Sequence, residues 1–327
     1  MKIQSSVIQN KFLRIKTINF GATLFEVFHK IKKTNLILNL GLINNYKYKN
    51  LYVGATCGRF AGRIENSKFT IGKNKFFLNK NEGVNTLHGG KVGFDRLIWK
   101  KIDHSKNKII YQLKSKHLDQ GFPGNLNINC IFELLDKSLF IRYEYVSDQP
   151  THVNLTNHSY WNLNLSKKHD IFNHDLKINS NKYLQVNKKL IPTGKLNKTH
   201  KTINDFSSFH NLGKKINLIK KNNIKKISNT INQSGFDLTF CVKKKSNRYV
   251  ATLKNDYSKI KLDIYSNLPG VQLYTSQSLR YKKSLFPYQG ICLETQYYPD
   301  TPNKKNFPTT LIKPNKRYRC FTKIKIN

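Results

Sequence analysis

The amino-acid sequence predicts a mainly β protein that folds as a large antiparallel two-layer β-sandwich. Three observations support this fold class. Apolar and polar residues alternate along several segments, turn signals separate those segments, and long amphipathic helices are scarce. The chain of 327 residues contains 20 Phe and 17 Tyr, so it can fill the large core that such a sandwich requires.

The strand prediction rests on a period of two. In SLFIRYEYV, residues 138–146, four apolar residues at alternate positions share one face, while Arg142 and Glu144 lie on the other. KLDIYSN, residues 261–267, alternates in the same way, and YRCFTKIKI, residues 318–326, supplies a late strand. Each segment is therefore expected to bury one face and expose the other.

Turn signals divide these strands. KFTIGKNKFFL, residues 68–78, is expected to form a hairpin that turns near Gly72 to Asn74. In GFPGNLNINCIF, Pro123 and Gly124 form a turn signal that leads into another strand.

Helical and inter-domain segments are hard to find. The segment KKINLIKKNNIKKIS, residues 214–228, spaces its Ile residues too irregularly for a helix, so we interpret it as a solvated insertion or loop. The chain contains neither a repeat of fixed length nor a linker rich in Pro, Gly and Ser. Residues 1–327 are therefore expected to form a single domain.

Cellular location is predicted from what the chain lacks. No run approaches the roughly 18 consecutive apolar residues of a membrane helix, and the first residues lack the apolar core and cleavage site of a secretory signal. The five cysteines are far apart and none forms a CxxC pair, so neither a disulfide framework nor a zinc site is indicated. We expect a cytoplasmic protein with reduced thiols and no membrane association.

The formal net charge of +40, from 58 Lys and Arg against 18 Asp and Glu, raises the alternative of a nucleic-acid-binding protein. The lysines are spread along the chain among Asn and Ile, however, and no RNA-recognition or zinc-finger signature accompanies them. Because the codons of these three residues are AT-rich, we interpret the charge as compositional drift. Weak nonspecific polyanion binding is its expected by-product, with no specific nucleic-acid partner. The charge disfavours close self-association at low salt and leaves a monomer or a dimer open.

Several polar residues interrupt the β pattern and are candidates for chemistry. Each of them lies beside glycine or aromatic residues or at the end of an apolar run, where burial of a polar group without a partner is costly. The candidates are Arg59 and Arg63 in GRFAGRIENSKF, His88 in NTLHGGKVGFDRLIW, His158 in NLTNHSYWNL, Glu294 in GICLETQYYPD, Asp237 in SGFDLTF and Gln272 in PGVQLYTS.

The motifs around these residues resemble those of the aldose 1-epimerase (galactose mutarotase) family. GRFAGRI, EGVN, NTLHGGKVGFDRLIW, GFPGN, NLTNHSYWNL, LIPTG, GVQLYT, LETQYYPD and NFPTTLIKPNKRY occur in the family's order over nearly the whole chain. One short motif recurs by chance, but nine in order are specific. The resemblance implies a galactose mutarotase-like supersandwich and a cofactor-free, metal-free isomerase. Its small-molecule substrate would be a free aldohexose such as galactose or glucose, whose α and β anomers it interconverts.

Carried over to this sequence, the resemblance makes Glu294 the general base and His158 the general acid. The resemblance also assigns sugar binding to four residues, which are Arg63, His88, Asp237 and Gln272. In addition, Trp161 or Tyr160 could cover the apolar face of the sugar ring.

The chemistry explains why a carboxylate and an imidazole are needed. A hemiacetal ring opens when one group takes the proton of the C1 hydroxyl and another delivers a proton to the ring oxygen, each contributing roughly 10²–10⁴ in rate. The two groups exchange roles on closure. We expect the nearby carboxylate of Glu294 to favour the imidazolium and to raise the pKa of His158.

Simpler interpretations remain for the single residues. His158 could satisfy buried hydrogen bonds, Arg63 could form a surface salt bridge with Glu65, and Asp237 could be a turn residue. His88 could likewise mark a turn before two glycines. Two positions also depart from the family pattern: Gly62 replaces an Asn before Arg63, and Leu238 replaces a His after Asp237. We expect these changes to affect sugar binding rather than proton transfer.

Other functions compete with the epimerase. An enzyme of the same fold could act on a sugar phosphate, and a glycoside hydrolase could use Asp237 and Glu294 as paired carboxylates. The chain could also be a non-catalytic sugar-binding protein or a polyanion-binding protein. Retention of both Glu294 and His158 favours an enzyme.

Overall fold

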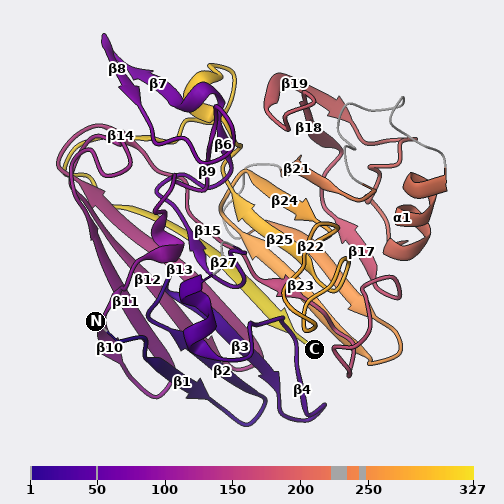
Figure 1. The fold of residues 1–327 in the computed structure, drawn as a ribbon. Helices are drawn as coiled ribbons and strands as arrows, with labels where there is room; N and C mark the ends of the chain where they lie inside the picture. Colours follow the sequence, from indigo (N-terminus) through magenta and orange to yellow (C-terminus); the bar gives the residue numbers. More distant parts are fainter. Residues whose placement is uncertain (1, 49–50, 222–233, 243–247) are drawn as a thin grey trace.

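The computed structural model describes residues 2–48, 51–221, 234–242 and 248–327. It is mainly antiparallel β, which confirms the predicted fold class (Figure 1). No helix within these residues is long and apolar enough to cross a membrane.

The largest sheet has nine strands, each antiparallel to its neighbours. Its spatial order is β10 (Lys100–His104), β11 (Lys108–Ser115), β12 (Leu126–Leu135), β13 (Ser138–Ser147), β27 (Tyr318–Ile326), β23 (Ile260–Ser266), β22 (Arg248–Asn255), β17 (Asp175–Ile178) and β20 (His210–Asn211). The predicted strands at residues 138–146, 261–267 and 318–326 correspond to β13, β23 and β27, so all three are confirmed.

A six-stranded sheet forms the second large element and carries the site described below. Its spatial order is β16 (Tyr160–Trp161), β25 (Ile291–Gln296), β24 (Gly270–Tyr274), β21 (Asp237–Cys241), β18 (Lys182–Val186) and β19 (Pro192–Lys198). One apolar cluster joins the two sheets, because Leu273 and Leu293 of the smaller sheet belong to the same buried core as Ile128 and Ile264 of the larger sheet. Burial of this apolar surface is the main favourable contribution to stability.

The remaining strands form smaller sheets around this sandwich. Four N-terminal strands pair in the order β1 (Ser5–Gln9), β2 (Leu13–Ile18), β3 (Thr23–His29) and β4 (Thr34–Asn35). Four two-stranded pairs are β5 (Thr56–Cys57) with β15 (Thr156–Asn157), β6 (Arg63–Ile64) with β9 (Thr86–Leu87), β7 (Lys68–Ile71) with β8 (Asn74–Phe77), and β14 (Thr151–His152) with β26 (Leu311–Ile312). The predicted hairpin at residues 68–78 is confirmed as β7 and β8, which project from the body of the molecule (Figure 1).

The helical segments are short, and one of them corrects the sequence analysis. In the part of the chain that the structure describes, the 3₁₀ turns are Ile43–Tyr48, Glu65–Ser67, Phe94–Arg96 and Thr301–Asn303. Helix α1 (Leu212–Lys221) lies where we expected a solvated loop at residues 214–228, so that prediction is wrong for residues 214–221. Leu212, Ile216 and Ile219 have the helical spacing of four and three and are buried. The segment considered in the sequence began after Leu212 and missed this pattern, and residues 222–228 lie outside the described chain.

Candidate active site

The six predicted site residues line one cavity of about 330 Å³, a volume within the usual range of small-molecule sites. The cavity lies over the six-stranded sheet, and further lining residues come from β6, from β9 and from loop segments around Tyr52, His158, Ser278 and Pro299. The six residues are Arg63, His88, His158, Asp237, Gln272 and Glu294.

Three neighbouring strands bring polar side chains to the cavity. In the register of β21, β24 and β25, Thr239 lies opposite Gln272 and Gln272 lies opposite Glu294. Side chains directly opposite each other in an antiparallel sheet point to the same face. The alternating residues Leu273 and Leu293 point into the core instead. The period of two therefore separates a polar cavity wall from an apolar packing face.

Glu294 occupies the deep part of this wall. Its side chain is 3% exposed, and burial raises the pKa of its carboxyl well above the ordinary value, with the nearby Asp237 adding to the effect. One carboxyl oxygen, Oε1, lies 3.6 Å from Nε2 of His158. The other, Oε2, is buried and has no hydrogen-bond partner among the described residues. Such an unpaired oxygen is costly in a folded protein and favours a ligand at this position.

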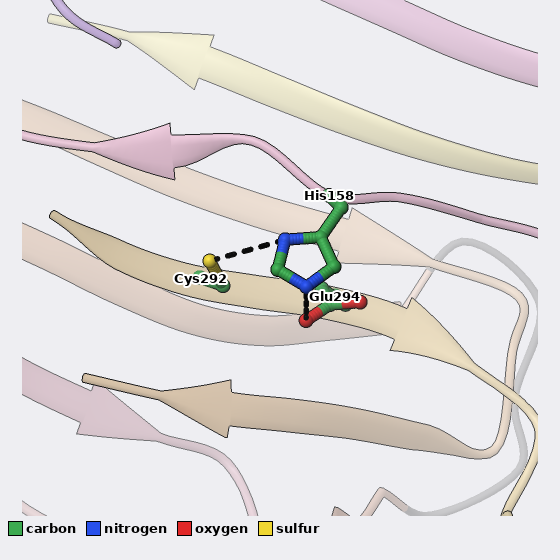
Figure 2. Close-up of side chains that lie close together, drawn as sticks. All are labelled: His158, Cys292 and Glu294. Carbon is green, nitrogen blue, oxygen red and sulfur yellow. Dashed lines mark hydrogen bonds and ion pairs between the residues drawn. The ribbon is translucent and has the colours of Figure 1, made fainter. Parts of the chain in front are cut away.

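His158 follows β15 and lies over strand β25. Figure 2 shows its imidazole between Cys292 and Glu294, with Nδ1 3.5 Å from the Cys292 sulfur. Burial lowers the pKa of His158 to about 4, so the predicted rise of this pKa is wrong. Loss of hydration disfavours the imidazolium, and burial also raises the pKa of the adjacent carboxyl, which weakens the support that this carboxyl gives to the imidazolium.

His88 faces the same cavity and is held by the backbone of Gly62. The His88 N–H donates to the Gly62 carbonyl, and the Gly62 N–H donates to Nδ1 of His88 at 3.3 Å. Because Nδ1 accepts, the neutral ring carries its proton on Nε2. Burial, assisted by the nearby His158 and Arg63, lowers the pKa of His88 well below its ordinary value. His88 is therefore a neutral donor toward the cavity.

Gly62 also accounts for one departure from the family pattern. Its φ of +79° is in the left-handed region, which Gly adopts without strain and Asn tolerates better than other residues. Gly62 therefore keeps the backbone that holds His88, but it offers no side-chain amide to a ligand.

Gly89, which follows His88, lies so close to the backbone of Gly58 that a side chain would not fit. Gly89 has a φ of +95°, and a Cβ at this position would lie 2.0 Å from the Gly58 carbonyl oxygen. We expect Gly89→Ala to lower the free energy of unfolding by about 1–3 kcal/mol, measured by urea denaturation. Gly72→Ala is the matched control, because Gly72 also has a positive φ, +60°, but a Cβ there meets no atom within 4 Å. Equal losses for the two variants would contradict the role of this contact.

Arg63 forms a bidentate ion pair with Glu82, in which Nε and Nη2 each donate to one carboxyl oxygen at 2.7 Å. The alternative of a salt bridge with Glu65 is wrong, because Glu65 pairs with Lys304. The fork fixes the guanidinium at the cavity wall, where its remaining N–H groups can donate to a ligand.

Asp237 is part of a hydrogen-bonded chain that links β21 and β24. The Thr239 hydroxyl donates to Gln272 Oε1, and Gln272 Nε2 donates to Asp237 Oδ1 at 2.6 Å. Burial raises the pKa of Asp237, while Arg63 and the Gln272 bond partly oppose this rise. The turn interpretation of Asp237 is wrong, because the residue begins strand β21.

Two other predicted candidates lie outside the cavity. Trp161 is 2% exposed and packs in the main core, whereas its neighbour Tyr160 lines the cavity with its ring 5.0 Å from that of His158. Arg59 is also buried elsewhere and donates to main-chain oxygens of Pro123 and Gly124. The motif around Arg59 suggested a catalytic or binding role. The guanidinium of Arg59 instead connects loops of the protein through hydrogen bonds to their main-chain oxygens.

The cavity also contains residues that the sequence analysis did not select. They include aromatic rings beside the two histidines and polar groups on the sheet. Two of these residues could have been found from the sequence. Glu82 belongs to the EGVN motif, and Gln296 lies two residues after Glu294. Gln296 is 1% exposed, and its Oε1 has no partner among the described residues. Among the additional lining residues are Tyr52, Glu82, Thr239, Tyr274 and Gln296.

A metal ion is a further possibility at His158, Cys292 and Glu294, whose ligand atoms lie within 4.8 Å of one another. The sulfur lies beside Nδ1 and the carboxyl beside Nε2, so the two groups contact different nitrogens of one ring. One ion can bond only one of these nitrogens. Burial also raises the pKa of Cys292 and disfavours the thiolate that binds metals. The contacts fit a hydrogen-bonded chain better than a metal centre.

Comparison with known sequences gives matches along the whole chain. The family model for aldose 1-epimerase matches residues 4–325. Galactose mutarotase from Bos taurus is 32% identical over 326 residues, which cover 97% of this chain and 92% of that protein. Aldose 1-epimerase from Escherichia coli (strain K12) is 29% identical and covers 96% of this chain, with 92% of its own length matched.

Solved structures give the same result. The GalM/aldose epimerase homologue from C. elegans superposes with a TM-score of 0.90 and 25% identity, covering 100% of this chain and 99% of that chain. Galactose 1-epimerase from Lactobacillus acidophilus has the same fold, with a TM-score of 0.83, 24% identity and coverage of 100% and 99%. The galactose mutarotase-like fold expected from the sequence is thereby confirmed. By its sequence and its fold, the chain belongs to the aldose 1-epimerase family.

Proposed function

We propose that this protein is an aldose 1-epimerase that interconverts the α and β anomers of a free aldohexose such as galactose or glucose. The observation that carries the proposal is the contact between Glu294 and His158 in the wall of a cavity lined by groups that bind hydroxyls. The family membership of the whole chain supports the same activity.

The reaction needs one acid and one base at the same time. Glu294 takes the proton of the C1 hydroxyl while His158 gives a proton to the ring oxygen, so that the C1–O5 bond breaks and a C1 carbonyl forms. After rotation about C1–C2, the C5 hydroxyl attacks the other face of the carbonyl. The proton transfers then run in reverse, so the pair ends with the single proton with which it began.

The pair can hold this one proton in two ways. In the empty cavity, the raised pKa of Glu294 and the lowered pKa of His158 place the proton on the carboxyl. A sugar hydroxyl that donates to the unpaired Oε2 of Glu294 favours the carboxylate, because hydrogen bonds to a charged group stabilise it. Substrate binding thus moves the proton toward His158, which gives the base and acid their working forms.

The other polar groups hold the pyranose. His88 offers its Nε2–H, Arg63 offers the free part of its fork, and Asp237 offers carboxyl oxygens to neighbouring hydroxyls. Gln272 orients Asp237, and the unpaired amide oxygen of Gln296 can accept from a further hydroxyl. The rings of Tyr52, Tyr160 and Tyr274 supply apolar surface.

The charge of the cavity favours a free sugar over a sugar phosphate. Among the described lining residues Arg63 is the one cation, and Glu82 neutralises it. Asp237 adds a further carboxyl without an added cation, and the pair of Glu294 and His158, which shares one proton, carries no net charge. A phosphate dianion would therefore be repelled here.

We expect kcat/KM for galactose or glucose to exceed that for the corresponding 6-phosphate by at least about tenfold. Polarimetry on freshly dissolved α anomers checks this, with the uncatalysed rate of each sugar subtracted as the control. Equal or faster reaction of the 6-phosphate would contradict the proposal. The same assay with a methyl galactoside tests the hydrolase alternative, since release of reducing sugar would favour paired carboxylates at Asp237 and Glu294.

Other features of the protein are also proposed. We infer a cytoplasmic protein that acts as one domain over residues 1–327, which the continuous core from Ile8 to Ile326 supports. Its net charge of +40 supports weak, salt-sensitive polyanion binding without sequence preference, and a monomer or a dimer.

A further inference from the structure

Cys292 contacts His158 on the side of the ring that faces away from Glu294. Its Sγ lies 3.5 Å from Nδ1, and the thiol is completely buried. Cys292 and Glu294 are two residues apart on β25, so their side chains share the face over which His158 lies (Figure 2). The three side chains therefore form a row in the order thiol, imidazole, carboxyl.

Four other groups contact His158 through their rings. Tyr160 and Tyr52 stack on it at 5.0 and 5.8 Å, and His88 and Tyr274 approach with their rings nearly perpendicular to it. These contacts fix the plane of the ring but do not distinguish its nitrogens. Among the described residues, Cys292 provides the hydrogen-bond partner of Nδ1.

We propose that Cys292 is the positioning residue for His158, and that its sulfur accepts the Nδ1–H and so keeps Nε2 toward Glu294 and the sugar. This inference rests on the proposed function, because it assigns Nε2 as the atom that exchanges a proton with the ring oxygen. The thiol stays protonated at neutral pH, since burial raises the pKa of Cys292 well above its ordinary value.

A thiol suits a reaction that runs in both directions. Nδ1 keeps its proton while Nε2 gains and loses one, so the sulfur accepts from the Nδ1–H both when His158 is neutral and when it is the imidazolium. A carboxylate in this position would accept the same hydrogen bond but, because it is charged, would favour the imidazolium throughout. Cys292 therefore supports both protonation states of His158 that anomer exchange requires.

The kinetic test compares Cys292→Ala, which removes the donor and acceptor, with Cys292→Ser, which keeps both. We expect Cys292→Ala to lower kcat by about 10–100-fold with little change in KM, and Cys292→Ser to recover most of the loss. The matched control is Cys320→Ala, because Cys320 is also buried but lies on β27 outside the cavity lining. Equal losses in the alanine and serine variants, or activity of Cys292→Ala within about twofold of the control, would overturn the proposal.

The spectroscopic test does not depend on activity. In ¹⁵N NMR of wild type at neutral pH, where His158 is neutral, we expect a protonated Nδ1 and an unprotonated Nε2. Comparison with a folded His158→Asn variant identifies the two signals. An unprotonated Nδ1 would overturn the proposal. Wild type that fails to accelerate mutarotation of any free aldose would refute the proposed function, and the tautomer would then decide the positioning role alone.

Discussion

Replacement of Glu294 by Gln is expected to lower kcat by about 10²–10⁴-fold. The amide has nearly the shape of the carboxyl, so it can still fill the position opposite Gln272, but it cannot accept the proton of the C1 hydroxyl. KM should change little, because several other groups hold the sugar. Polarimetry on α-D-galactose measures this loss. Glu133→Gln is the matched control, since Glu133 pairs with Arg142 on the large sheet, away from the cavity.

The same substitution is expected to raise the melting temperature. Folding raises the pKa of Glu294 above its value in the unfolded chain, roughly 4.3. Above that pH the native state therefore holds more protons than the unfolded state, and stability falls as pH rises through the folded pKa. The amide of the Glu294→Gln variant does not titrate, so the advantage of this variant should grow from acidic to neutral pH. A variant that retains activity, or that melts below wild type at neutral pH, would contradict the buried role of this carboxyl.

Part of the site could be predicted from the sequence. Polar and apolar residues alternate along β24 and β25, and this alternation places Gln272 and Glu294 on the faces opposite to Leu273 and Leu293. The order of the motifs then identifies the family. The register that sets Gln272 against Glu294 is a long-range pairing, however, and no local pattern specifies it.

The pKa values were the least predictable part. A carboxyl beside an imidazole suggested a charged pair, but the sign of each shift depends on how much water the surrounding chain removes. For His158 and Glu294 burial is the largest effect, and it comes from rings and strands distant in the sequence, such as Tyr52.

Arg59 and Trp161 failed as site candidates for a related reason. A buried arginine or tryptophan inside a functional motif looks the same in sequence whether it faces a ligand or a neighbouring loop. Arg59 meets carbonyl oxygens near Pro123, and Trp161 pairs through its backbone with Ile291 and enters the core. Glu82 is a cavity residue that the sequence analysis did not select. Its partner Arg63 lies on β6, and only the pairing of β6 with β9 brings the segments that contain the two residues together.

His158→Asn is expected to lower kcat by about 10²–10⁴-fold and to change the pH dependence in a way that Glu294→Gln does not. In wild type the pair works while it holds one proton. Below about pH 4 the imidazole of His158 takes up a second proton, no base remains, and kcat/KM falls. As pH rises through the raised pKa of Glu294, the last proton is lost and kcat/KM falls again.

The fall of kcat/KM at acid pH shows whether His158 carries a proton or only packs against its neighbours. Folding lowers the pKa of His158 from roughly 6.5 to about 4, so the unfolded chain binds more protons between these values and stability falls as pH falls through them. His158→Asn removes this loss of stability and also the fall of activity near pH 4, and the residual activity falls instead as the carboxylate of Glu294 is protonated below its raised pKa. If the variant instead keeps the wild-type acid limb at reduced kcat, another group supplies it, and His158 then acts by packing against Tyr160.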